Sequence, residues 1–137
     1  MTLKLSKKEI EKFSRQIILK NIGTLGQKKI LSSKVLIIGM GGLGCPAAEF
    51  LTRSGIGTLG IVDNDNVSLS NLHRQSLYSE KDLNQPKVIV SKKKLNIINS
   101  KTKINIFNFK LDKKNFKKII KSYDYIIDGT DNFESKF

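Results

Sequence analysis

The sequence predicts an α/β fold with a doubly wound, mostly parallel sheet. Residues 35–38 are a continuous aliphatic run, which is typical of a strand buried on both faces of a parallel sheet. A glycine-rich turn, a segment of helical composition over 43–54 and a second apolar run over 58–62 follow. That second run ends at an acid. Strand, glycine turn, helix, strand and acid in this order indicate a Rossmann-like nucleotide-binding unit.

The glycine turn has the spacing G-x-G-x-x-G at Gly39, Gly41 and Gly44, with an extra glycine at Gly42. Glycines leave no side chain between the backbone N–H groups and a phosphate, and the following helix terminus adds partial positive charge. Asp63, 19 residues after Gly44, is placed to accept hydrogen bonds from ribose hydroxyls. The alternative is a turn whose glycines only let the helix and strand pack closely.

Composition limits the classes of partner. The chain of 137 residues has no apolar stretch of membrane-spanning length and no apolar signal-peptide core, so we expect a cytoplasmic protein without a membrane partner. Its single cysteine, Cys45, excludes an internal disulfide framework. The net charge of +13 comes from 25 basic residues, of which only Arg15, Arg53 and Arg74 are arginine. Scattered lysines without interleaved aromatic residues make nucleic acid an unlikely partner.

An amino-terminal helical arm over residues 1–33 precedes the nucleotide-binding domain, which we place at 34–137. Ser6 and Glu9 form a capping box, and the apolar spacing behind them predicts a helix over 7–20. Gly23 breaks this helix, and a short second helix over 25–31 leads into the first strand.

A polar stretch over 64–85 follows the βαβ unit and lacks regular periodicity, which is typical of a functional loop. Pro86 suits the first turn of a helix that extends to about residue 99. A third strand over 103–109, a helix capped by Asp112 and ending at 121, and a fourth strand over 125–128 complete the pattern. Because ligands bind outside the carboxyl ends of parallel strands, Asp63 and Asp131 should face one crevice.

The sequence resembles the ThiF/MoeB family of adenylyltransferases, which activate sulfur-carrier proteins and are related to ubiquitin-activating enzymes. Five separated segments carry the resemblance: FSRQIIL at 13–19, VLIIGMGGLGCPAAEFL at 35–51, GIGTLGIVDNDNVSLSNLHRQ at 55–75, QPK at 85–87 and DGTDNF at 128–133. The resemblance implies that ATP and Mg²⁺ adenylate the carboxyl-terminal glycine of a ubiquitin-like carrier ending in Gly-Gly, for thiamine or molybdopterin biosynthesis.

The resemblance also implies roles for individual residues. Asp63 would hold the ribose, Asp131 with Asn132 beside it would support magnesium, and Arg15 would reach the phosphates of the neighbouring subunit in a homodimer. The residues expected to be catalytic are Arg15, Arg74, Lys87 and Asp131. The expected nucleotide-binding set is Gly39, Gly41, Gly42, Gly44, Asp63, Asp65, Ser70, Asn71, Leu72, His73, Arg74, Lys87, Asp131 and Asn132.

Cationic groups suit this chemistry, because a carboxylate that attacks an α-phosphate is an anion meeting an anion. Arginine binds two phosphate oxygens at once, which lysine does not. Cys45 has two interpretations: a helix terminus would lower its pKa and activate it, or it packs as a small buried residue, which we favour. His73, the only histidine, is not expected to bind a metal.

The sequence departs from the family at its carboxyl end. The family's catalytic cysteine and zinc-binding cysteines belong to a carboxyl-terminal half that is missing here, so we expect an amino-terminal fragment that is inactive alone, with Zn²⁺ only in the missing half. Two other functions stay open. Asp63 would serve the ribose of a nicotinamide cofactor in an NAD(P)-dependent oxidoreductase equally well, and the domain could be a non-catalytic module that binds a ubiquitin fold.

Overall fold

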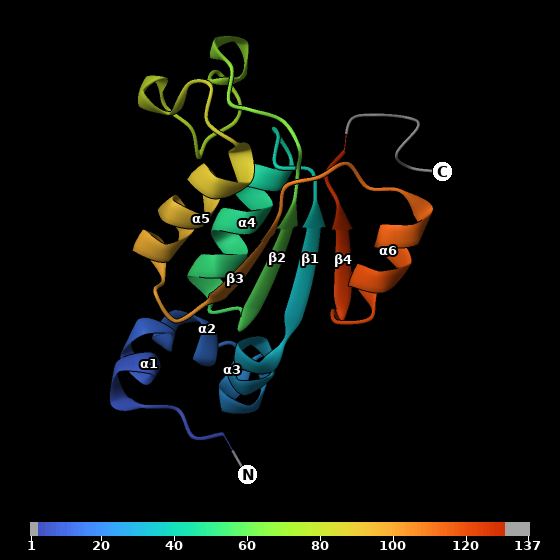
Figure 1. Ribbon diagram of the computed structural model, residues 1–137. Coiled ribbons are helices and arrows are strands. Elements are labelled where there is room, and N and C mark those ends of the chain that lie inside the picture. The colour runs from blue at the N-terminus through green and yellow to red at the C-terminus, as the bar shows by residue number, and fades with distance from the viewer. Residues whose placement is uncertain (1–2, 131–137) are drawn as a thin grey trace.

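Four parallel strands form the centre of the computed structural model, which describes residues 3–130 (Figure 1). They are β1 (Lys34–Ile38), β2 (Thr58–Val62), β3 (Lys103–Phe107) and β4 (Tyr125–Asp128), and they lie in the order β3-β2-β1-β4. All three pairings between them are parallel. The predicted α/β class with a Rossmann-like parallel sheet is therefore confirmed.

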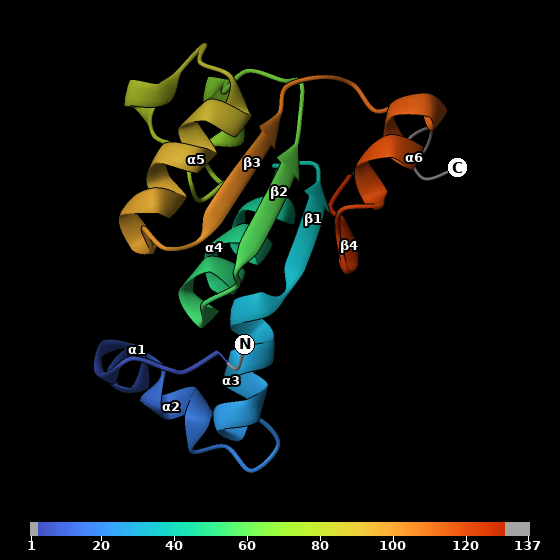
Figure 2. The same cartoon turned by 60° about the horizontal axis from the view of Figure 1, so that its bottom comes forward.

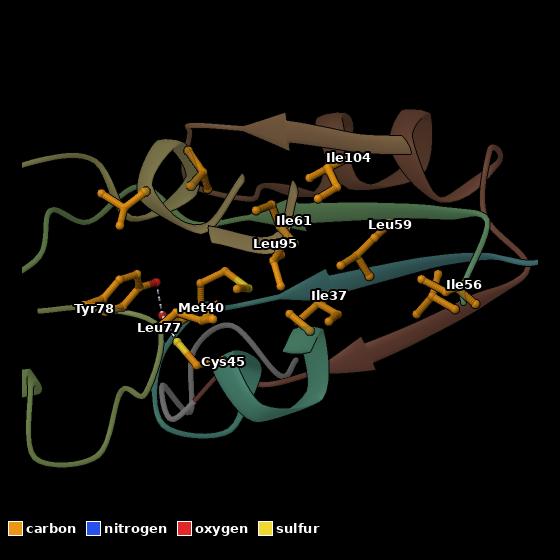
Figure 3. Close-up of a cluster of buried hydrophobic side chains, with 14 of the residues drawn as sticks. Ile37, Met40, Cys45, Ile56, Leu59, Ile61, Leu77, Tyr78, Leu95 and Ile104 are labelled. Atoms are coloured by element: carbon orange, nitrogen blue, oxygen red, sulfur yellow. Dashed lines mark hydrogen bonds between the residues drawn. The ribbon is translucent and has the colours of Figure 1, made fainter. Parts of the chain in front are cut away.

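The core lies between one face of this sheet and two helices. Val35, Ile37, Leu59 and Ile61 are buried in a single apolar cluster, to which Leu95 contributes from the helical layer (Figure 3). Alternate residues of a strand point to opposite faces, so the intervening positions of β1 and β2 face the other side. Hydrophobic burial on both faces explains why these strands are nearly continuous aliphatic runs.

Two helices cover the core face of the sheet, and a third lies at its β4 edge. The helices α4 (Gly44–Ser54) and α5 (Lys87–Ile98) lie side by side against the core face, whereas α6 (Lys113–Ile120) lies beyond β4 (Figures 1 and 2). On the second face, the Tyr123 side chain packs directly over Gly60, where any Cβ atom would collide with the phenol ring. Gly60 is therefore required for close packing.

The polar stretch over 64–85 lies above the carboxyl ends of the strands (Figure 1). It contains two short 3₁₀ helices, η1 (Leu69–Asn71) and η2 (Glu80–Asp82), and is closed by an antiparallel bridge between Asn66 and Pro86. Pro86 is the N-cap of α5, one position before the predicted first turn. Lys87 is therefore the first helical residue.

The prediction of one helix over 7–20 is wrong. The chain instead forms α1 (Lys7–Lys12) and α2 (Ser14–Ile17), separated at Phe13, whose φ of −105° and ψ of 14° depart from helical values. Phe13 is buried, with 3% of its surface exposed, and its ring packs against Gly55 beyond the end of α4. A long-range contact of this kind overrides the local helical pattern.

Other boundaries move by smaller amounts. The helix α3 (Gly23–Ser32) begins at Gly23, which was expected only to break the preceding helix and which takes the left-handed φ of +59°. The strand β3 ends at Phe107, two residues before the predicted end. Figure 2 shows that α3 runs into β1, with α1 and α2 beside it at the amino ends of the strands.

The strand β4 is an edge of the sheet and pairs only with β1 among the described strands. Tyr125 is 65% exposed and Ile126 is 43% exposed, as expected from an edge with little cover. Between residues 3 and 130, no helix combines the length and the apolar character needed to span a bilayer.

Candidate nucleotide-binding site

A cavity of about 910 Å³ opens at the carboxyl ends of the strands, where the fold predicts a ligand site. Its volume lies in the range of cofactor sites. Its walls come from the turns after β1, β2 and β4, from the polar stretch and α5, and from the segment after β3. The lining residues are Ile38, Gly39, Gly41, Gly42, Leu43, Val62, Asp63, Asn64, Asp65, Asn66, Ser68, Asn71, Arg74, Gln75, Lys87, Phe109, Lys110, Leu111, Gly129 and Thr130.

Two glycines of the turn are required by backbone packing. Gly39 has a φ of +90°, and a Cβ atom there would lie 3.1 Å from the Gly129 carbonyl in the turn after β4. Gly44 packs so closely on the Gly39 carbonyl oxygen that no side chain fits. The turn is thereby folded back on itself, and α4 begins at Gly44 without a side-chain cap on its N–H groups. Uncapped N–H groups at a helix terminus favour an anion.

Asp63 links the first two strands at the floor of the cavity. Its Oδ2 accepts a hydrogen bond from the Met40 N–H at 2.8 Å, and its Oδ1 accepts one from the Asp65 N–H at 2.8 Å. A carboxylate has about four acceptor positions, so both oxygens retain lone pairs for ribose hydroxyls. The carboxylate is thus already oriented by the backbone.

Two cationic side chains face this floor from different elements. The Arg74 Nη1 donates to the Ser70 carbonyl at 3.2 Å, and the Arg74 stem lies against the position that a Gly42 side chain would occupy. Lys87 approaches the Asp65 Oδ2 at 3.9 Å, and its side chain is only 6% exposed, whereas that of Asp65 is 70% exposed. A buried ammonium with one distant and solvated carboxylate is costly. An anion in the cavity would compensate it.

The structure brings most of the predicted nucleotide-binding residues into one cavity. Those in the lining are Gly39, Gly41, Gly42, Asp63, Asp65, Asn71, Arg74 and Lys87. Asp131 and Asn132 lie outside the described residues.

Five of the predicted residues do not line the cavity. Gly44 lies beneath the turn, and Leu72 packs on the core. Ser70 contacts Ser68, with 3.3 Å between their Oγ atoms, and His73 places its Nδ1 3.0 Å from the Ser70 carbonyl oxygen. Arg15 is exposed on α2, at the opposite end of the sheet from the glycine turn (Figure 1).

Several lining residues had no role in the sequence-based prediction. Gln75 is 3% exposed, and its Oε1 has no hydrogen-bond partner among the described residues. The sequence feature that could have indicated Gln75 is its place in the polar stretch over 64–85. Thr130 donates from its N–H and its Oγ1 to Asp128 in the predicted turn after β4. Phe109 was assigned to the end of the third strand, which stops at Phe107, and Lys110 and Leu111 were given no role.

Burial decides the state of Cys45. The residue is fully buried, and burial raises the pKa of its thiol above the ordinary value. The interpretation as a packing residue is the one that the structure supports. The expectation that His73 binds no metal stays a prediction. Across residues 3–130, no group of three or more acidic, cysteine or histidine side chains is arranged to hold a metal ion.

The comparison with protein families matches residues 13–137 to the ThiF family. The chain belongs to the ThiF family. It is 46% identical over 132 residues to the molybdopterin-synthase adenylyltransferase of Haemophilus influenzae, covering 96% of this chain and 54% of that protein. It is 36% identical over 132 residues to the sulfur carrier protein adenylyltransferase of Thermus thermophilus, covering 96% of this chain and 49% of that protein.

A solved structure supports the same fold. The ATP complex of the E. coli tRNA N6-threonylcarbamoyladenosine dehydratase TcdA superposes with a TM-score of 0.87 at 24% identity, covering 95% of this chain and 53% of that chain. The chain spans about half the length of the curated adenylyltransferases named above. Membership of this family weighs against the oxidoreductase alternative, because the curated relatives carry adenylyltransferase names.

Proposed function

We propose that this protein binds ATP with Mg²⁺ in the cavity at the carboxyl ends of β1 and β2 and adenylates the carboxyl-terminal glycine of a ubiquitin-like sulfur carrier ending in Gly-Gly. The observation that carries the proposal is the convergence of four features on one cavity: the start of α4, whose N-cap residue Leu43 lines the cavity and gives no side-chain cap, together with Asp63, Arg74 and Lys87. The carrier would serve thiamine or molybdopterin biosynthesis. The name of the Haemophilus relative makes the carrier of molybdopterin synthase the first to test.

The reaction needs the charges that the cavity presents. A carboxylate oxygen of the carrier attacks the α-phosphorus, the bond from that phosphorus to the oxygen bridging the α- and β-phosphates breaks, and pyrophosphate leaves with the electron pair. The products are a carrier acyl-adenylate and pyrophosphate. Arg74 and Lys87 would stabilise the phosphate charge, while Asp63 and the glycine turn would fix the nucleoside end. Such positioning supplies much of the rate in phosphoryl-group chemistry.

The magnesium ion in this proposal would be held largely by the nucleotide. The described residues contain no ready-made cluster of three ligands. Mg²⁺ in nucleotide sites is commonly bound by one or two carboxylates together with phosphates and water. Gly129 lines the cavity, and Asp131 follows it by two residues in the sequence. We propose Asp131 as the carboxylate for this role. The ion would neutralise charge on the leaving pyrophosphate.

The second element of the proposal is a homodimer in which Arg15 completes the partner's site. Arg15 is exposed at the amino ends of the strands, while the cavity lies at the carboxyl ends. Nearby arm residues expose large apolar side chains, with Ile18 71%, Leu19 53% and Leu25 73% exposed. Clustered exposed apolar residues are typical of a protein contact surface.

Pyrophosphate exchange tests the proposed function. A version of the protein that spans the relatives' full length should incorporate labelled pyrophosphate into ATP only when a carrier ending in Gly-Gly and Mg²⁺ are present. Arg74→Ala should reduce this exchange by about 100-fold or more, as expected for loss of a phosphate-binding cation. Tight binding of NAD without exchange would overturn the proposal. If the protein binds a carrier and its partner-dependent activity is unchanged in Arg74→Ala, it is instead a non-catalytic binding module.

A further inference from the structure

We propose that Tyr78 is a positioning residue for the nucleotide turn: its hydroxyl fixes the peptide between Met40 and Gly41 so that the Gly41 N–H faces the cavity. The inference rests on the proposed function only in taking a nucleotide phosphate as the acceptor for that N–H. Tyr78 itself lies behind the turn, in the apolar core, and lines no part of the cavity (Figure 3).

The peptide units on both sides of Met40 are held by side chains from separate parts of the chain. The Met40 N–H donates to the Asp63 Oδ2 at 2.8 Å. The Met40 carbonyl accepts a hydrogen bond from the Tyr78 hydroxyl at 2.7 Å and a weaker one from the Cys45 thiol at 3.5 Å (Figure 3). Met40 is fully buried, so its carbonyl depends on these protein donors.

Peptide planarity carries this constraint to Gly41. In a trans peptide, the C=O of one residue and the N–H of the next point in opposite directions, and the described chain has no cis peptide bond. Because Tyr78 holds the Met40 carbonyl toward the core, the Gly41 N–H must point away from the core. Gly41 lines the cavity, and its N–H donates to no acceptor within residues 3–130. It is therefore oriented as a donor to an anion in the cavity.

The Tyr78 hydroxyl is suited to be a permanent donor. Tyr78 as a whole is 6% exposed, and burial raises the pKa of its hydroxyl far above the ordinary value, so the proton remains in place. The Ser91 Oγ lies 3.2 Å from the hydroxyl oxygen. Since the single Tyr78 proton is directed at Met40, Ser91 acts as donor to Tyr78 and polarises its hydroxyl.

Side chains from the polar stretch over 64–85 contact both sides of the glycine turn. Arg74 and Gln75 approach it from the cavity, near Gly42 and Gly41 respectively, and Tyr78 supports it from the core. Gln75 has its carboxamide nitrogen 3.5 Å from the position of a Gly41 side chain. The stretch that carries Arg74, the proposed phosphate-binding residue, therefore also fixes the backbone conformation of the glycine turn through Tyr78.

Replacement of the hydroxyl tests the inference. In Tyr78→Phe, the affinity for MgATP measured by calorimetry should fall by about tenfold, the scale of one misplaced hydrogen bond. The amide NMR signal of Gly41 in ligand-free protein should shift and broaden as its peptide reorients. The matched control is Tyr123→Phe, which removes a hydroxyl that accepts from Asn105 away from the cavity, and it should leave both measurements at wild-type values.

These measurements distinguish a positioning role of Tyr78 from a loss of stability, and they distinguish failure of this inference from failure of the proposed function. Affinity is measured well below the unfolding temperature, so a lower melting point alone would not change it. A Tyr78→Phe protein with wild-type MgATP affinity and an unchanged Gly41 signal would overturn the inference. The calorimetry is done on a version that spans the relatives' full length. If that wild-type protein binds no MgATP, the proposed function fails, and the Gly41 signal still decides the positioning role. Should Tyr78→Phe not fold, rapid solvent exchange of the Tyr78 hydroxyl proton in the wild-type protein would contradict the proposed bond.

Discussion

The Asp63 carboxylate, directly after β2, accepts the Met40 N–H of the glycine turn at 2.8 Å, so the segments that follow β1 and β2 are joined by a side chain as well as by the sheet. The same carboxylate also accepts the Asp65 N–H. Asp63 therefore has a structural role in the ligand-free protein in addition to the ribose-binding role that we propose.

We predict that Asp63→Asn lowers both stability and nucleotide affinity. An amide has one acceptor oxygen, so one of the two N–H groups now bound would lose its partner. The free energy of unfolding should fall by about 1–3 kcal/mol, as for a charged hydrogen bond that is removed. Urea unfolding and MgATP calorimetry measure the two effects. Glu80→Gln, at an exposed position of η2, is the control and should change neither; equal behaviour of both variants would exclude the structural role.

Gly44 and Gly42 should separate the folding role of the turn from its binding role. A methyl group in Gly44→Ala would overlap the Gly39 carbonyl, and we expect a loss of about 3 kcal/mol or more in unfolding free energy. A methyl group in Gly42→Ala would lie 3.5 Å from the Arg74 Cδ, an ordinary contact with a flexible side chain. That variant should stay within about 1 kcal/mol of wild type.

Nucleotide affinity provides the second half of this comparison. The Gly42→Ala methyl group would occupy the lining of the cavity where a phosphate approaches the backbone, so MgATP affinity should fall although the protein remains folded. Denaturant unfolding and calorimetry on the same samples make the comparison. Wild-type affinity in Gly42→Ala would show that the nucleotide does not approach this part of the turn.

Cys45 should behave as a core thiol. Because burial raises its pKa above the ordinary 9.0, the thiol contributes stability that is complete below about pH 9 and is lost as the pH rises through the folded-state pKa. At about pH 8, alkylation by iodoacetamide should be at least tenfold slower than in the unfolded chain. Mass spectrometry with and without guanidinium chloride measures the rates. Equal rates in folded and unfolded protein would indicate an accessible thiolate.

The exposed edge at β4 should promote association of the 137-residue chain. Tyr125 and Ile126 are exposed on a strand whose outer side pairs with no described strand. A charged side chain on an edge discourages pairing between edges. Ile126→Glu should therefore reduce concentration-dependent scattering, whereas Glu80→Gln should not. An unchanged scattering profile in Ile126→Glu would place the associating surface elsewhere.

The parts of the fold that sequence reasoning found are those with local signals. The buried strand β1, the start of β2 and the helix cap at Asp112 follow from aliphatic runs and capping residues. The break at Phe13 depends on its contact with Gly55, which has no local signature. Likewise, the hydrogen bond from Tyr78 to Met40 joins residues 38 positions apart, and Tyr78 lies in a stretch without periodicity. The sequence alone therefore could not predict this bond, and only the structure shows it.

The last prediction is that Arg15 acts in the partner's site. The exposed α2 lies at the amino ends of the strands, so within one chain Arg15 is separated from the cavity by the length of the sheet (Figure 1). A two-fold dimer would place each arm at the other subunit's site, because contacts across a two-fold axis are reciprocal.

Subunit mixing tests this arrangement in a version that spans the relatives' full length. Arg15→Ala and Arg74→Ala should each be nearly inactive in pyrophosphate exchange as homodimers. In a mixed dimer, one site carries both lesions and the other carries neither. Random pairing of equal amounts makes half of the dimers mixed, so roughly a quarter of the wild-type activity should return if the sites act independently. Arg53→Ala, which removes the ion pair with Glu49 on the solvent side of α4, is the control and should be active without mixing. Absence of recovery, despite subunit exchange demonstrated by mass spectrometry, would show that Arg15 acts within its own chain or has only a structural role.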